Sequence, residues 1–179
     1  EYKIVFDRLI EKSKQLKKQN PNTIIFLGGD IVHSKVELSP ESVNLTQYLF
    51  RELSNIAPII LITGNHDCNL NNSSRMDSLT PIVNALNLKN FYYLKDSGVY
   101  RFNNIDFTVM SVFDHPSTFL DSIPNSTQLQ IALHHGAVDN AKTDIGYVLQ
   151  SGHITLKKFD GYDFTWLGGT DAAKGSIHA

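Results

Sequence analysis

The chain has 179 residues, and 16 Lys and Arg against 18 Asp and Glu give it a formal net charge of −2. Hydrophobic residues make up 41% and charged residues 19%, a composition typical of a folded globular domain and not of a disordered chain. The longest apolar runs have four to five residues, so no membrane-spanning helix is expected. The single cysteine, Cys68, excludes an internal disulfide framework and a cysteine-based zinc cage.

The start of the chain predicts a cellular location. Residues 1–20 are charged and amphipathic and lack the apolar segment of a secretory signal. We therefore expect a cytoplasmic, nucleoid or nuclear protein that is neither secreted nor bound to a membrane. Because the chain begins with Glu1 and not Met, we also expect a fragment that is truncated at its N-terminus.

The order of the expected elements predicts an α/β fold. Apolar residues at helical spacing predict an amphipathic helix over 2–20, and the apolar run at 23–27 predicts a strand covered on both faces. Ser39 as N-cap and Pro40 at the first helical position predict a second helix. Further expected elements are a strand at 58–62, a helix at 77–86, and strands at 91–94, 99–102, 105–112, 129–133 and 164–167. This order predicts one domain over 1–168 with two sheets, followed by a tail at 169–179.

Polar residues that can bind metals follow the apolar strands directly. In α/β sheets, ligands bind outside the carboxyl ends of the strands, and glycines there let the backbone turn tightly. Their oxygen and imidazole donors are suited to zinc, manganese or iron and do not form a thiolate site. The four segments in question are Gly28-Gly29-Asp30-Ile31-Val32-His33, Thr63-Gly64-Asn65-His66-Asp67, His134-His135-Gly136 and Gly168-Gly169.

Each of these residues also has a structural interpretation. A Gly-Asp pair after a strand is common, and His33 can simply pack in a loop. The pair His134-His135 can be a strand end with one ring buried and hydrogen-bonded. Gly-Asn-His-Asp directly after a buried strand is much rarer, and the joint occurrence of the segments favours a metal site that acts on phosphoryl groups.

These segments resemble the motifs of a known superfamily. Leu27-Gly-Gly-Asp-Ile-Val-His33, Gly64-Asn-His-Asp67 and a strand ending in His134 are similar to motifs two, three and four of the calcineurin-like metallophosphoesterases. His33 at the fourth place of Gly-Asp-x-x-His is most similar to the DNA-repair nuclease subunit of the SbcCD type. The resemblance spans 1–168 and implies a four-layer α/β/β/α sandwich, with two mixed sheets flanked by helices.

The resemblance implies a role for each matching residue. Asp30 would bridge two divalent metal ions, most often Mn²⁺, while Asn65 and His134 would bind the second ion and His135 is the less expected ligand. His66 would be the catalytic histidine, Asp67 would orient it, and His33 would help to orient the substrate. The implied activity is hydrolysis of phosphodiester bonds in DNA, as an exonuclease or endonuclease. The implied partners are DNA, a coiled-coil ATPase subunit and a second copy of the chain.

Two family motifs have no clear counterpart here. Residues 1–20 lack the Asp-x-His that supplies ligands of the first ion, and after Gly168 the chain lacks the final Gly-x-His. His178 is a candidate replacement ligand, while the tail over 169–179 is otherwise interpreted as a linker or a non-native extension. Two alternatives to the nuclease therefore stay open. One is a phosphoesterase that acts on small phosphodiesters, and the other is a catalytically incomplete binding module with the same fold.

Overall fold

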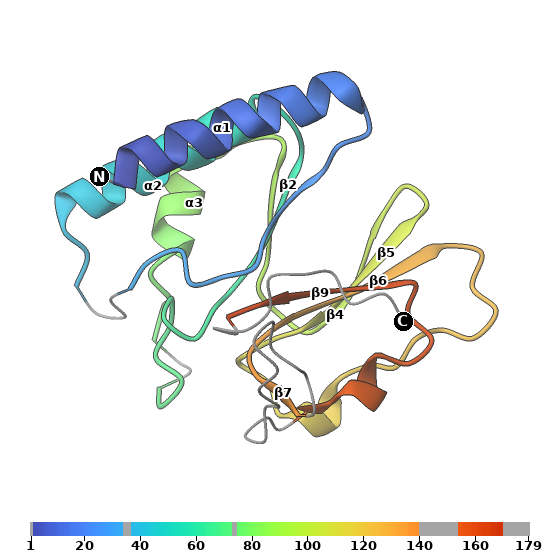
Figure 1. Cartoon of the computed structure of the whole chain (residues 1–179). Helices are drawn as coiled ribbons and strands as arrows, with labels where there is room; N and C mark the ends of the chain where they lie inside the picture. Colours follow the sequence, from blue (N-terminus) through green and yellow to red (C-terminus); the bar gives the residue numbers. More distant parts are fainter. Residues whose placement is uncertain (1, 34–36, 73–74, 140–153, 170–179) are drawn as a thin grey trace. The chain divides into compact units, whose positions relative to one another are not determined.

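The computed structural model describes residues 2–33, 37–72, 75–139 and 154–169 (Figure 1). The sequence predicted one domain, and contacts between residues divide the chain into two compact units. The first unit takes residues up to Leu27, then Ile31–Leu61 and His66–Tyr93. The second unit takes the two short segments Gly28–Asp30 and Ile62–Asn65 and the chain from Leu94 onwards. The expected tail lies outside the described residues from position 170.

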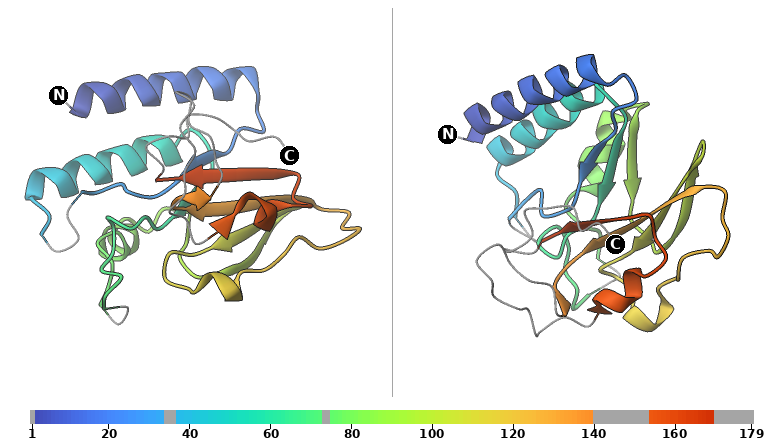
Figure 2. Two further views of the ribbon diagram at one scale, coloured as in Figure 1. Left: turned by 60° about the horizontal axis from the view of Figure 1, so that its bottom comes forward. Right: turned by 45° about the vertical axis from the view of Figure 1, so that its right-hand side comes forward.

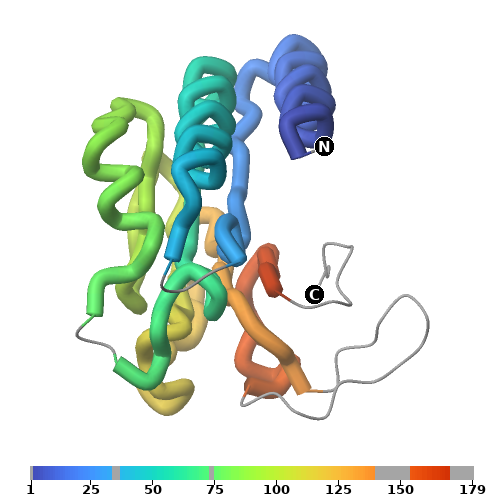
Figure 3. Tube along the Cα trace, turned by 90° about the vertical axis from the view of Figure 1, so that its left-hand side faces the viewer, coloured from blue at the N-terminus to red at the C-terminus, as the bar shows by residue number. Residues whose placement is uncertain are grey.

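The first unit is a three-stranded sheet with three helices. The sheet has the order β1 (Ile25–Leu27), β2 (Ile59–Ile62), β3 (Phe91–Leu94). Strands β1 and β2 are parallel, with Ile25 opposite Ile59. The helices are α1 (Tyr2–Gln19), α2 (Pro40–Ser54) and α3 (Thr80–Leu86). Figure 3 shows α2 (cyan) between α1 (blue) and α3 (green), and α2 contacts both of them.

Helix α2 begins where the sequence predicted it. The hydroxyl oxygen of Ser39 accepts a hydrogen bond from the backbone N–H of Ser42 at 3.1 Å, and Pro40 occupies the first turn, where no N–H is needed. The buried face of α2 contributes to two clusters of the core. Leu53 packs with residues of α1 and β2, and Phe50 packs with residues of β2 and α3. The apolar face of this helix is therefore what joins the other two helices to the sheet.

Helix α3 begins three residues later than the sequence predicted. The carboxylate of Asp77 accepts hydrogen bonds from the backbone N–H groups of Leu79 and Thr80 at 3.0 and 2.8 Å, and from the Thr80 hydroxyl at 2.6 Å. Asp77 therefore satisfies donors at the helix start and lies outside the helix itself.

The second unit contains a mixed four-stranded sheet. Its order is β4 (Gly98–Phe102), β5 (Ile105–Met110), β6 (Leu129–His135), β9 (Phe164–Gly168). Strand β4 is antiparallel to β5, whereas β5, β6 and β9 are parallel to one another; β9 is the red arrow in Figure 2. A small parallel sheet pairs β7 (Val138–Asp139) with β8 (Ile154–Thr155), and 3-10 turns span Pro116–Thr118 and Leu156–Phe159.

Several strand boundaries differ from the prediction by one or two residues, and β1, for example, begins at Ile25 and not at 23. Contacts explain the differences at the ends of β5 and β6. Strand β5 ends at Met110 and not at 112, because Ser111 leaves the ladder: its N–H donates to the Ser97 hydroxyl and its own hydroxyl donates to the carbonyl of Lys95. Strand β6 runs on to His135 because His134 and His135 still pair with β9, opposite Leu167 and Gly168.

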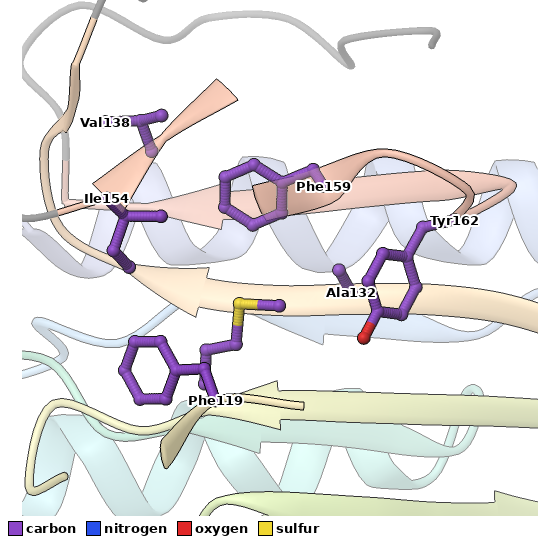
Figure 4. Close-up of a cluster of buried hydrophobic side chains, with 7 residues drawn as sticks. Phe119, Ala132, Val138, Ile154, Phe159 and Tyr162 are labelled. Carbon is purple, nitrogen blue, oxygen red and sulfur yellow. The ribbon is translucent and has the colours of Figure 1, made fainter. Parts of the chain in front are cut away.

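A buried apolar cluster covers one side of the four-stranded sheet (Figure 4). Met110 and Ala132 contribute from the strands, and Phe119, Phe159 and Tyr162 contribute from the connecting segments. The cluster fixes those segments against β5 and β6, since each of its side chains is at most 6% exposed.

The predicted α/β class, with sheets flanked by helices, is confirmed. None of the helices in the described part of the chain combines the length and the apolar character that crossing a membrane requires.

Candidate metal centre

The strand ends that the sequence singled out meet in the second unit. The segments after β1 and β2, Gly28–Asp30 and Ile62–Asn65, belong to this unit together with the ends of β6 and β9. The backbones of Gly168 and Gly28 lie so close together that a Cβ at Gly168 would collide with the carbonyl of Gly28. Glycine at this position therefore lets two backbones touch, so that the polar side chains beside them converge.

His135 is the centre of this arrangement. Its Nδ1 atom lies 2.6 Å from the carbonyl oxygen of Gly28. Its Nε2 atom lies 2.9 Å from Oδ1 of Asn65 and 3.2 Å from Oδ2 of Asp30. The His135 side chain is 1% exposed and that of Asp30 is 28% exposed, so the group is reached from the Asp30 side.

The hydrogen bond at Nδ1 determines what Nε2 presents to its neighbours. A carbonyl oxygen only accepts, so Nδ1 of His135 carries the proton that is donated to Gly28. In the neutral ring, Nε2 then directs its lone pair towards Oδ2 of Asp30 and Oδ1 of Asn65. Nε2 of His135 thus lies within hydrogen-bond distance of two oxygens. A cation bound by the nitrogen and both oxygens would offset the repulsion between their lone pairs.

Glycines and backbone strain hold this geometry. Asp30 has a left-handed backbone, with φ of 54°, which Asp tolerates better than most residues. A Cβ at Gly64 would collide with the backbone N and the Oδ1 atom of Asp30, and a Cβ at Gly169 would collide with the ring of His135. Gly29 has φ of 86°, and a Cβ there would lie 2.8 Å from Nδ1 of His135. Glycine at positions 29, 64 and 169 therefore leaves the space that the side chains of Asp30 and His135 occupy.

The neighbouring histidine points to the other side of the sheet. We expected His134 as the ligand and His135 as the lesser candidate, but successive residues of a strand face opposite sides. Nδ1 of His134 lies 2.9 Å from the carbonyl oxygen of Met110, and its ring centroid lies 5.9 Å from that of Phe119 and 6.4 Å from that of Phe159. Burial lowers the pKa of His134, an effect that the hydrogen bond to Met110 opposes without cancelling. The structure therefore brings His135, and not His134, together with Asp30 and Asn65.

The expected catalytic residues lie in the first unit. The rings of His33 and His66 stack with centroids 5.2 Å apart and an angle of 17° between their planes. Asp67 is fully buried, and its Oδ1 atom accepts the backbone N–H of Val32 at 3.1 Å. Asp67 thus ties the segment before His33 to the segment of His66. Its expected hydrogen bond to His66 stays a prediction.

Among the described residues, no three side chains of His, Cys, Asp or Glu cluster as a metal site. The group around His135 holds two such side chains, His135 and Asp30, with the amide of Asn65 as the third donor. Asp7, an aspartate within the segment 1–20 that lacks the Asp-x-His motif, is engaged elsewhere. It forms an ion pair with Lys3 at 2.9 Å and accepts a hydrogen bond from the hydroxyl of Tyr48 at 2.7 Å. His178 lies outside the described residues.

Sequence reasoning identified the strand ends but missed two contributors. The carbonyl of Gly28, which sets the protonation of His135, belongs to the backbone and leaves no signal in side-chain chemistry. The role of Gly169 depends on its contact with His135, which lies 34 positions earlier, and no local pattern in the sequence predicts that contact.

The fold and this donor set define a class of protein. The chain matches the model of the family described as calcineurin-like phosphoesterase over residues 4–171, and it therefore belongs to that family. Membership implies a hydrolase of phosphoesters that uses divalent metal ions. It establishes neither the SbcCD-type branch nor the identity of the metal.

A viral protein is also similar to this chain. "Uncharacterized protein R555" of Acanthamoeba polyphaga mimivirus is 44% identical to it over 177 residues. The alignment covers 94% of this chain and 13% of R555, so the chain spans only a small part of its relative's length.

The described donor set fits one divalent cation. Asp30, Asn65 and His135 offer two oxygens and one imidazole nitrogen, a mixture suited to first-row metals such as manganese, iron and zinc. The carbonyl of Gly28 behind the ring is the kind of support that metal-binding histidines commonly have.

Proposed function

We propose that this chain is the phosphodiesterase domain of a metal-dependent DNA-processing nuclease. The convergence of three electron-pair donors from Asp30, Asn65 and His135 is the observation that supports metal-dependent catalysis. A cation bound there would offset charge on a phosphoryl oxygen and lower the pKa of a bound water. We propose Mn²⁺ for this site, on the resemblance to the nuclease branch.

Each of the other residues of the site has a proposed role in binding the cation or the substrate. Asp30 and Asn65 orient oxygens towards the site, and His135 holds its Nε2 lone pair ready because Gly28 fixes its tautomer. For His66 we propose contact with the scissile phosphate and donation of a proton to the leaving oxygen. For His33, stacked on His66, we propose a role in orienting the substrate.

Hydrolysis of an aryl phosphodiester and of linear duplex DNA, with and without Mn²⁺, tests the proposal. We expect His66→Ala and Asp30→Ala to abolish the manganese-dependent rates. His115→Ala is the matched control, because the His115 side chain is exposed and its hydrogen bonds go to the neighbouring Ser117. Full activity of His66→Ala and Asp30→Ala would refute the assigned site, and cleavage of the aryl ester but not DNA would favour a small-molecule phosphodiesterase.

A second candidate function follows from the incomplete ligand set. The group of Asp30, Asn65 and His135 offers donors for one cation at most, and the alternative function is that of a binding module that keeps the fold without catalysis. Calorimetric titration with Mn²⁺ separates these cases. Two ions per chain with turnover support the enzyme, whereas one ion or none without turnover supports the module.

The proposed macromolecular partners rest on the nuclease resemblance. They are DNA, a coiled-coil ATPase subunit and a second copy of the chain. Light scattering of the chain alone measures self-association. Co-purification with a candidate ATPase, in the presence and absence of DNA, tests the other two.

A further inference from the structure

Helix α1 carries a row of exposed apolar side chains on the flank away from α2. Four large side chains, which we call the apolar row, are each between 43% and 74% exposed: Tyr2, Val5, Leu9 and Leu16. Phe6 and Ile10 lie on the inner face of the helix and pack with residues of α2 and of the sheet. Figure 3 shows α1 at the end of the row of three helices. Large apolar side chains that lie together on a surface are typical of an interaction site.

The apolar row has the spacing of a seam between two helices. Positions 2, 5, 9, 12 and 16 follow one another at alternating intervals of three and four residues, as the a and d positions of a heptad do. Side chains at this spacing form knobs along one side of a helix, and the knobs fit between those of a second helix. An extended strand has a different periodicity, because its side chains alternate between two faces. The spacing therefore favours a helical partner.

Lys12 occupies the fourth position of this seam and indicates the charge of the partner. Lys12 and Arg8, one turn earlier, are both exposed, and neither forms an ion pair with another residue in the described part of the chain. The acidic side chains of α1 are already engaged in ion pairs within the helix: Asp7 with Lys3 and Glu11 with Lys14. Two like charges four residues apart repel one another, so carboxylates of a partner beside the row would stabilise the pair.

A second copy of α1 is a poorer match for this seam. In a parallel pair, Lys12 would lie opposite Lys12 of the other copy. In an antiparallel pair that overlaps over the whole helix, Lys12 would lie opposite an apolar residue of the row. Either arrangement leaves an ammonium group in an apolar seam without a counter-charge, which is unfavourable. The charges therefore favour an acidic helix from another protein.

We propose that the apolar row of α1 is a docking surface for an acidic amphipathic helix of a partner protein. The apolar ridge of that helix packs along the row, and its Asp or Glu side chains pair with Arg8 and Lys12. The row shares no residue with the candidate metal centre, so this proposal stands or fails separately from the proposed function.

Fluorescence anisotropy with the full chain and two labelled peptides tests the proposal. Both peptides are helices of three heptads that lactam bridges hold in shape, with Leu at the a and d positions. The acidic peptide has Glu at one central d position and beside the ridge, and the basic peptide has Lys in place of every Glu. We expect saturable binding of the acidic peptide, weakening as salt is added, and no saturable binding of the basic peptide.

Three variants assign the binding to the row. Lys12→Glu should weaken binding of the acidic peptide at least about tenfold and favour the basic peptide, because it reverses the charge within the seam. Leu9→Gln should weaken binding at least about fivefold by removing an apolar contact. Lys18→Glu is the matched control, since it makes the same change of charge at an exposed position of α1 outside the row, and it should keep binding within about twofold.

Three results of the peptide titrations overturn the proposal: no saturable binding of the acidic peptide, equal binding of the basic peptide, or an equal loss in Lys18→Glu and Lys12→Glu. Lys12 and Leu9 are exposed, so neither variant removes a residue of the buried core.

Two further measurements detect other occupants of the row. Sedimentation velocity would detect a second copy as self-association that Leu9→Gln abolishes. Flotation with phosphatidylserine vesicles would detect a lipid surface as binding that Leu9→Gln abolishes. Either result overturns the proposal of a partner helix.

Discussion

Adjacent histidines on β6 occupy opposite sides of one sheet and have different surroundings. On one side, His135 directs Nε2 towards the carboxylate of Asp30 and the amide of Asn65. On the other side, His134 packs near the rings of Phe119 and Phe159. Both rings place Nδ1 against a backbone carbonyl, at 2.6 Å for His135 and 2.9 Å for His134. The hydrogen bond at Nδ1 is therefore common to both residues, and the groups that face the rest of each ring determine its chemistry.

This difference shows that strand geometry gives two identical side chains different surroundings. Side chains alternate across a sheet, so a shift of one residue in the register of β6 would exchange the two environments. The register is fixed by pairing with β5, where His134 lies opposite Met110, and with β9, where His135 lies opposite Gly168. The glycine opposite His135 also leaves the room that the backbone of Gly28 occupies.

The largest effect that we expect is on metal affinity. His135→Ala removes one of three donors and should weaken Mn²⁺ binding roughly a hundredfold or more, since loss of a mere supporting group already costs about ten- to a hundredfold. His134→Ala should leave the affinity within about threefold. Calorimetric titration of both variants measures this. A greater loss in His134→Ala would reverse the assignment and restore our sequence-based choice of His134.

The next effect separates the two histidines by stability. His134→Ala leaves a cavity between buried aromatic rings and removes a hydrogen bond to Met110, so we expect the free energy of unfolding to fall by about 2 kcal/mol. Urea unfolding of the metal-free chain gives this value. His134→Phe, which fills the space without the hydrogen bond, should recover part of the loss. An unchanged unfolding midpoint in His134→Ala would show that the ring is not packed as described.

A smaller effect tests whether the glycines beside Asp30 and His135 position these side chains. In Gly64→Ala the new Cβ collides with Asp30, which should move the carboxylate and weaken Mn²⁺ binding about tenfold. The visible spectrum of Co²⁺ bound in place of Mn²⁺ should also change, because it reports the geometry of the ligands. If affinity and spectrum both stay as in the unaltered chain, the approach of Gly64 to Asp30 does not position the ligand.

The smallest effect concerns the ion pair of Arg101 and Asp106, which lies on the same sheet, involves neither histidine and contributes stability that depends on pH. Two hydrogen bonds from Arg101 at 2.7 Å lower the pKa of Asp106, whose side chain is 1% exposed. Because the pKa is lowered in the folded state, this stabilisation is present above the ordinary pKa of Asp, about 4, and is lost as the pH falls through the folded value. Asp106→Asn should flatten the fall in stability in this acid range. Urea unfolding of both proteins between about pH 2.5 and 6 measures this. If the free energy of unfolding falls equally steeply with pH in Asp106→Asn and in the unaltered chain, the Arg101–Asp106 pair contributes nothing.

The sequence determined the class of fold, the order of most elements and the places where the chemistry gathers. Ser39-Pro40 specified the start of α2, and the apolar runs specified β1, β2, β6 and β9, because these are local effects of capping and of burial. The prediction that Asp30, Asn65 and a histidine at the end of β6 meet followed from a general rule about strand ends. The family match over 4–171 agrees with the motifs that were read from the chain.

Only the tertiary structure decided which residues come together and where the elements end. The sequence could not distinguish His134 from His135, because the face that each presents depends on the pairing of β6 with β5 and β9. It could not place the start of α3, because Asp77 is as acceptable inside a first turn as before it. Local sequence determines local conformation, whereas a site depends on contacts between residues far apart in the chain.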